Sequence, residues 1–179
     1  MADHRILDVA HHRDLRIRTG AGAELGDAVM ASLAVPAEFR RLACEYPILF
    51  RYSSEARAFH ALALFGFEPG ENLFLADGRW DASCRPLAMA VPPLLAGRSR
   101  AGDGPSQVHI DMGHPRIATG NDGERVFDEA GQPTRLLRDA AAMLGALDEG
   151  FRATEGFLAA ADRLGLLEPF SMDVTLDNG

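Results

Sequence analysis

Three potential metal ligands lie close together in the chain: His109, Asp111 and His114. On a strand, side chains two residues apart share a face, so His109 and Asp111 would project side by side. This spacing occurs in facial-triad iron sites, and it predicts, as one alternative, an Fe(II)- or Zn-dependent enzyme of oxygenase or hydrolase type. No histidine follows His114, which would itself need a sharp turn at Gly113, although an acid from residues 122–129 could complete a site. We therefore favour hydrogen-bonded residues at a strand end, and we expect no cofactor.

The second candidate is the pair Arg79-Trp80, which includes the chain's only tryptophan. Both side chains are flat and can stack on a ligand, so the pair predicts a ligand-binding surface. The pair also follows Asp77-Gly78, which is a strong turn signal. A large aromatic side chain beside a turn mostly buries apolar area. Burial of Trp80 in the core is therefore the interpretation that we favour.

A third polar cluster is His11-His12-Arg13-Asp14. Asp14 could orient a histidine as a general base. We favour a salt bridge between Arg13 or Arg16 and a carboxylate where a strand begins. The sequence lacks a Gly-x-Ser-x-Gly nucleophile elbow, a Walker A loop and a dinucleotide-binding glycine fingerprint. It therefore identifies no catalytic residue.

The charge pattern argues against nucleic-acid binding. The formal net charge is −8, all 18 basic residues are arginine, and no basic block stands out, whereas a nucleic-acid site needs a basic patch. No stretch approaches the ~20 apolar residues of a membrane span, and residues 1–14 lack the apolar core of a signal peptide. We expect a cytoplasmic protein that binds an unidentified protein partner or small ligand, without a membrane span. The pattern leaves the oligomeric state open, and Cys44 and Cys84 are expected to be free thiols.

The first two thirds of the chain favour short strands. Extended segments are expected at residues 5–19, 48–50, 59–67, 73–75 and 107–112. Pro36 is expected to open a short helix that Pro47 ends. Residues 86–96 are expected to form irregular chain or a short helix, because prolines interrupt them.

Two glycine-rich segments predict connections between these elements. Residues 97–106 are expected to form a mobile surface loop. Gly120-Asn121-Asp122-Gly123 predicts a hairpin turn between residues 117–119 and residues 125–127.

The last third of the chain predicts amphipathic helices. Apolar residues recur at helical spacing, and the side chains expected to be buried are Leu136, Leu137, Leu144 and Leu147. Gly150 is expected to end the first helix, and Gly165 to cap a second one. An extended piece follows at residues 172–176. Strands followed by helices favour an α+β fold, with a mostly antiparallel sheet from residues 5–127 and C-terminal amphipathic helices packed on it.

The order and spacing of several segments resemble the SapC-like family of bacterial proteins, which is named after a surface-layer-associated protein. The resemblance covers about residues 12–179 and implies a single SapC-like domain over residues 1–179. The segments that carry it include His12-Arg13-Asp14-Leu15-Arg16, Glu45-Tyr46-Pro47-Ile48-Leu49-Phe50, Leu64-Phe65-Gly66-Phe67, Glu71-Asn72-Leu73-Phe74, Gly78-Arg79-Trp80, Ile110-Asp111, Val126-Phe127-Asp128-Glu129 and Leu164-Gly165-Leu166-Leu167.

The sequence departs from the family pattern in two places. Cys84-Arg85-Pro86-Leu87-Ala88 to Pro92-Pro93 stands where relatives have an aromatic segment with two arginines. Relatives also continue past Asp177-Asn178-Gly179, so we expect a C-terminal portion of relatives to be missing here.

The resemblance implies no reaction mechanism. Some relatives are encoded beside outer-membrane receptors, which implies an accessory role in envelope or nutrient-uptake systems. The leading interpretation is therefore a non-enzymatic binding or accessory module. The alternative is the metal-dependent enzyme that uses His109 and Asp111. A third interpretation, a subunit of a surface-layer or envelope assembly, is disfavoured by the lack of a signal peptide.

Overall fold

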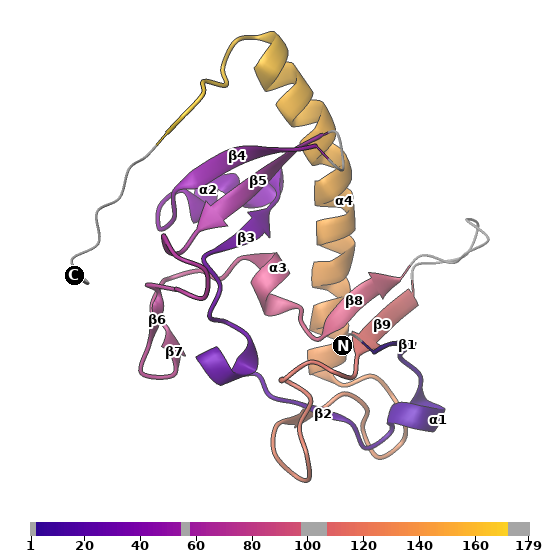
Figure 1. The fold of residues 1–179 in the computed structure, drawn as a ribbon. Coiled ribbons are helices and arrows are strands. Elements are labelled where there is room, and N and C mark those ends of the chain that lie inside the picture. The colour runs from indigo at the N-terminus through magenta and orange to yellow at the C-terminus, as the bar shows by residue number, and fades with distance from the viewer. Residues whose placement is uncertain (1–2, 55–57, 98–106, 172–179) are drawn as a thin grey trace.

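A computed structural model of the chain describes residues 3–54, 58–97 and 107–171. In this part of the chain, small antiparallel sheets lie against one long C-terminal helix (Figure 1). The expected α+β fold is confirmed. Gly97 ends a strand, whereas the rest of the predicted loop at 97–106 and the extended piece expected at 172–176 lie outside the described residues.

One three-stranded sheet has the order β3 (Ala31–Ala34), β5 (Ala58–Leu64) and β4 (Ile48–Ser53). Ala61 and Ala63 of β5 are buried and face the core. On the opposite face, the register places Leu33, Leu62 and Leu49 side by side across the three strands. We call these three residues the leucine row. Leu33 is 39% exposed, so the row begins at solvent-exposed apolar surface.

A second three-stranded sheet brings the N-terminus to the middle of the chain. Its order is β1 (His4–Ile6), β9 (Gln107–Asp111) and β8 (Leu94–Gly97). Ile110 is fully buried and pairs with Leu94. The predicted strand at 107–112 is confirmed, and residues 86–96 contain the short helix α3 (Leu87–Ala90) before β8 begins.

The hairpin predicted around residues 120–123 is wrong. The N-terminal strand β2 (Arg16–Ile17) pairs with β10 (Glu124–Arg125), and its Ile17 also bridges to Ile117. β2 therefore lies between the two segments that were expected to pair with each other. The turn signal at residues 120–123 predicted that the segments on either side of it pair with each other. Instead, each of them pairs with β2.

The hairpin predicted at Asp77-Gly78 is confirmed. β6 (Leu75–Ala76) and β7 (Arg79–Trp80) pair across it. Both turn residues have positive φ, 50° for Asp77 and 70° for Gly78. These angles match the type I′ turn that an Asp-Gly pair favours.

Short helices connect the strands. They are α1 (Val9–His12) and α2 (Phe39–Leu42), with 3-10 turns at η1 (Ala23–Leu25) and η2 (Pro36–Glu38). Pro36 opens η2 as predicted, and α2 continues directly from it. The buried Tyr46 follows α2 and accounts for much of the core below the first sheet.

The C-terminal helix α4 (Arg135–Arg163) is a single helix, so the break predicted at Gly150 is wrong. A Cβ atom on Gly150 would lie 2.6 Å from the Cβ atom of the fully buried Val35. The glycine therefore allows α4 to approach the chain after β3. A helix needs packing more than propensity to persist, and this contact outweighs the glycine's low helix propensity.

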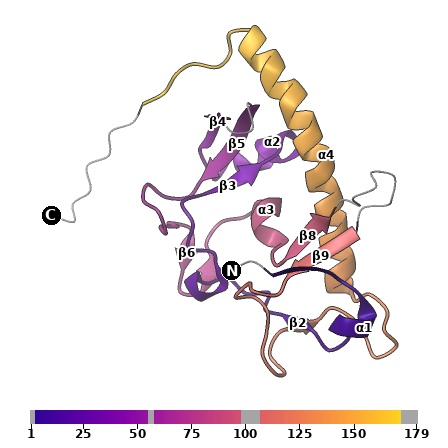
Figure 2. The ribbon, with the colours of Figure 1, turned by 45° about the vertical axis from the view of Figure 1, so that its right-hand side comes forward.

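The apolar stripe and the C-cap of α4 follow the sequence pattern. Leu137, Leu144 and Leu147 are buried, while Leu136 is half-buried. At the C-terminus, Gly165 has a φ of 66°. The N–H of Leu166 donates to the carbonyl of Ala161 at 2.9 Å, which closes a Schellman motif. Figures 1 and 2 show α4 running past both three-stranded sheets.

Candidate functional site

Trp80 belongs to an aromatic cluster under the first sheet. Its ring meets Phe65 edge to face, with centroids 5.2 Å apart, and its Nε1 donates to the Tyr46 hydroxyl at 2.8 Å. The Tyr46 hydroxyl in turn donates to the carbonyl of Cys84. Burial raises the pKa of Tyr46, so its hydroxyl remains a donor. Trp80 is half-buried rather than fully enclosed.

The arginine that stacks on Trp80 is Arg85 rather than Arg79. The Arg85 guanidinium carbon lies 4.9 Å from the indole centroid. Arg79 is exposed and precedes Trp80 on β7, where neighbouring side chains point to opposite faces. Arg79 and Trp80 were proposed to form a ligand-binding surface together. In the structure, Trp80 stacks with the guanidinium of Arg85 instead. Its partner, Arg85, comes from the segment that precedes α3.

Arg85 continues into a buried ionic centre built around Asp27, which is 2% exposed. Arg116, 3% exposed, donates from one nitrogen to both Asp27 carboxylate oxygens at 2.8 Å each, and Arg85 also pairs with this carboxylate. The backbone N–H of Gly22 adds a further bond at 3.0 Å. Burial lowers the pKa of Arg85, and the charge of Asp27 opposes that shift. We call Asp27, Arg85 and Arg116 the Asp27 centre.

Sequence reasoning did not identify the Asp27 centre. Asp27 and Arg116 are separated by 89 residues, and Asp27 and Arg85 by 58. No local motif links them.

The predicted metal ligands do not converge in the structure. Asp111 accepts bonds from the backbone N–H groups of Asp3, at 2.9 Å, and Gly113, at 3.0 Å, and the Asp3 bond is the main cause that lowers its pKa. The His109 ring lies against Gly97, where a Cβ atom would collide with it. Residues 3–54, 58–97 and 107–171 contain no group of three or more side chains placed to hold a metal ion.

His114 forms a local contact instead of joining His109 and Asp111. Its Nδ1 accepts a bond from the backbone N–H of Arg116 at 3.1 Å. Burial lowers the pKa of His114, and the positive charge of Arg116 lowers it further. This histidine therefore borders the Asp27 centre.

The contacts of residues 11–14 are a helix cap and an ion pair. Asp8 caps α1 by accepting from the N–H of His11 at 2.8 Å, and the buried His12 lies in the same helix. Asp14 pairs with Arg125 at 2.7 Å and does not orient a histidine. A salt bridge at a strand entry was expected here, and its arginine comes from β10 rather than from the cluster itself.

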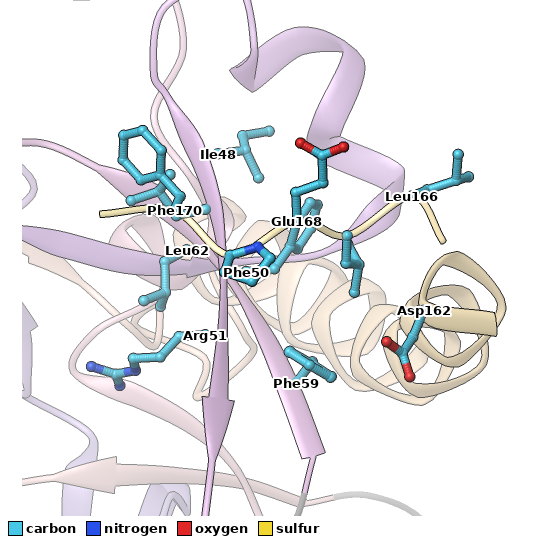
Figure 3. A pocket seen from close by; sticks show the side chains of 12 residues that line it. Ile48, Phe50, Arg51, Phe59, Leu62, Asp162, Leu166, Glu168 and Phe170 are labelled. Carbon is cyan, nitrogen blue, oxygen red and sulfur yellow. The ribbon is translucent and has the colours of Figure 1, made fainter. Parts of the chain in front are cut away.

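A groove of about 630 Å³ lies beside β4. Figure 3 shows the segment after α4, residues 166–170, crossing over β4 and β5. The groove is lined by Ile48, Leu49, Phe50, Arg51, Phe59, Leu62, Asp162, Leu166, Leu167, Glu168, Pro169 and Phe170. We call this space the β4 groove.

Apolar side chains dominate the β4 groove and remain accessible. Leu166 and Phe170 are 70% and 68% exposed, and Phe50 is 38% exposed. Leu49 and Leu62 join the groove to the leucine row. Contiguous exposed apolar surface of this kind marks an interaction site more often than a surface without function. Arg51 on one side and Asp162 and Glu168 on the other add charges at its rim.

The edge of β4 adds a backbone surface to this groove. Four consecutive residues, 48–51, line the groove although successive side chains point to opposite faces of a strand. The groove therefore follows the strand edge rather than one face. Within the described part of the chain, β4 pairs with β5 alone, so its other edge is free to accept an extended segment.

Comparison with known proteins gives one match. A family model described as SapC matches residues 7–179. No curated protein and no solved structure matches the chain. Among the described residues, no helix is long and apolar enough to cross a membrane.

Proposed function

The chain belongs to the SapC family over residues 7–179, and from this premise we propose that it is a non-enzymatic binding module that docks an extended, apolar segment of a partner protein in the β4 groove. The observation that carries the proposal is the free edge of β4 beside exposed apolar side chains. Strand addition supplies backbone hydrogen bonds, and pockets for alternate side chains supply specificity.

The chemistry of the groove favours a polypeptide over a small polar substrate. Its lining contains several aliphatic or aromatic side chains and only three charged ones, Arg51, Asp162 and Glu168. No histidine, cysteine or serine lines it. The metal-dependent alternative receives no support from the geometry of His109 and Asp111.

The finer expectations rest on the sequence and the family resemblance alone. They are a partner from an envelope or nutrient-uptake system, a surface-layer association and a cytoplasmic location. We propose them as properties of the partner and of its location in the cell. The peptide selection that tests the β4 groove does not depend on them.

The proposal is tested with a random peptide library displayed on phage and selected against the native protein. We expect enriched peptides in which apolar residues alternate, as an added strand requires. Their binding should be lost in Leu166→Glu, because this exposed side chain lines the groove. Leu73→Glu is the matched control, since Leu73 is 61% exposed and does not line the groove.

Two outcomes would contradict the proposal. One is a selection that enriches no peptide. The other is enriched peptides that bind native protein and Leu166→Glu equally well. If the native protein self-associates in analytical ultracentrifugation and Leu166→Glu abolishes the association, the occupant is a second copy of this chain instead of a partner.

A further inference from the structure

A second cavity, of about 220 Å³, adjoins the Asp27 centre. Its lining residues come from β2 and the two residues after it, the connection from α3 to β8, and the first turns of α4, together with Arg85 and Arg116. Three arginines line it: Arg18, Arg85 and Arg116. The remaining lining is almost wholly apolar and comprises Ile17, Thr19, Ala90, Val91, Pro92, Pro93, Leu94, Leu136, Ala140 and Met143. We call this space the arginine cavity.

Positive charge exceeds negative charge at the arginine cavity. Asp27 is the buried carboxylate of the centre, and Arg116, Arg85 and the N–H of Gly22 already share its oxygens. The other terminal nitrogen of Arg116 is occupied as well, since it donates to the carbonyls of Arg18 and Gly20. Asp122 approaches Arg18 Nε only to 4.0 Å and is largely exposed. Three arginines thus line a cavity beside the fully engaged carboxylate of Asp27. One terminal nitrogen of Arg18 also donates to the carbonyl of Pro115, at 2.6 Å.

Two donors at this cavity have no hydrogen-bond partner. They are Nε of Arg18 and Nε of Arg85, both buried, and neither finds an acceptor among the described residues. A buried charged donor without an acceptor is costly, and buried polar groups nearly always have partners. Arg18 and Arg85 both line this cavity, so an anionic group bound there could supply the missing acceptors.

We propose that the arginine cavity binds a small carboxylate whose body is apolar. The planar guanidinium matches the geometry of a carboxylate, and the aliphatic lining suits a hydrocarbon or aromatic body. A phosphate would leave several oxygens against apolar side chains, which is unfavourable. The volume is below the range of about 300–1,000 Å³ for drug-sized ligands, so the ligand is small.

This site is independent of the proposed partner docking. None of the residues that line the arginine cavity lines the β4 groove. Loss of one binding activity therefore leaves the other to be measured in the same protein.

The test uses benzoate as the probe and isothermal titration calorimetry of the full chain. Benzamide serves as the neutral match, and inorganic phosphate as the anion without an apolar body. We expect saturable binding of benzoate with a Kd below about 1 mM, weakening as salt is added. Benzamide and phosphate should bind at least roughly tenfold more weakly, which corresponds to the loss of one charged hydrogen bond or more.

Three variants locate the site. Arg18→Gln should weaken benzoate binding roughly tenfold or more. We expect this variant to fold, because the Arg18 side chain is 37% exposed. Ala140→Leu should abolish binding by filling the cavity, since Ala140 lines it from α4. Arg16→Gln is the matched control, because Arg16 lies two residues before Arg18, does not line the cavity and donates to the carbonyl of Gly123.

Several results would each overturn the proposal. They are no benzoate binding to native protein, equal binding of benzamide, or equal losses in Arg16→Gln and Arg18→Gln. Tighter binding of phosphate than of benzoate would also overturn it, because the cavity would then recognise charge without the apolar body.

Discussion

The Asp27 centre and the β4 groove use opposite chemistry within one small fold. At the Asp27 centre, a carboxylate that is 2% exposed is shared by two arginines and a backbone N–H. At the β4 groove, apolar side chains stay up to 70% exposed beside a free strand edge. Buried charge must be paired to be tolerated, whereas exposed apolar surface is tolerated and can serve binding. Substitutions at the centre should therefore alter stability, and substitutions at the groove should alter binding.

The largest expected effect breaks the Asp27 centre. Asp27→Asn keeps the size of the side chain but leaves Arg85 and Arg116 without their buried anion. Loss of one partner of a buried ion pair costs about 3–5 kcal/mol. Urea denaturation measures this free energy of unfolding. The matched control is Asp14→Asn, whose pair with Arg125 is exposed and should cost no more than about 1 kcal/mol. Equal effects at Asp27 and Asp14 would remove the contrast.

The second prediction compares a buried leucine of the core with an exposed leucine of the β4 groove. Leu144 of α4 is 6% exposed, and Leu144→Ala should lower the free energy of unfolding by about 2–5 kcal/mol. Leu166→Ala in the groove should change it by no more than about 0.5 kcal/mol, because the side chain is 70% exposed. Chemical denaturation of both variants is the measurement. A cost below about 1 kcal/mol at Leu144 would show that this face of α4 is not core.

The third prediction tests the close packing of α4 against Val35 at Gly150. Gly150→Ala should destabilise the protein by about 1–2 kcal/mol, because overpacking against Val35 outweighs the better helix propensity. Gly145→Ala, on the same helix with no atom within 4 Å of its new Cβ, should instead stabilise by about 0.5–1 kcal/mol. Thermal unfolding of the two variants should shift in opposite directions. If both substitutions stabilise the protein, the packing of α4 against Val35 does not require glycine at position 150.

The smallest expected effect is on pH dependence at the border of the Asp27 centre. Burial and Arg116 lower the folded-state pKa of His114. The unfolded chain then binds more protons as pH falls through about 6.5, so stability present above that pH is lost below it. His114→Asn should therefore reduce the loss of unfolding free energy between about pH 7.5 and about pH 5. An unchanged slope in urea denaturation would show that His114 contributes nothing to it.

Local sequence signals predicted much of the fold. The Asp77-Gly78 turn, the stripe of α4 and the cap at Gly165 depend on residues close in sequence, and all three were identified correctly. Two errors have a common origin. The expected break at Gly150 and the expected hairpin at residues 120–123 were reversed by contacts with Val35 and with β2, which lie about a hundred residues away in sequence.

The candidate sites were harder to predict for the same physical reason. Stacking was the less favoured interpretation of Trp80, and its partner Arg85 begins a segment interrupted by prolines that periodicity does not place. Asp27 lies in a stretch without clear pattern, and nothing in its neighbours indicates that it is buried. The β4 groove depends on where residues 166–170 return after α4, which the C-cap at Gly165 starts but does not direct.

The pairing of β2 with β10 has a consequence for how the chain is made. Residues 16 and 17 of β2 pair with residues 125 and 124 of β10. During synthesis, β2 therefore emerges from the ribosome long before β10 has been made. At about 5–20 residues per second, that interval is roughly 5–20 s. β1 meets the same delay through its pairing with β9. Co-translational folding of this protein should therefore begin in its middle, at the β4–β5 hairpin, and the first strands should join last.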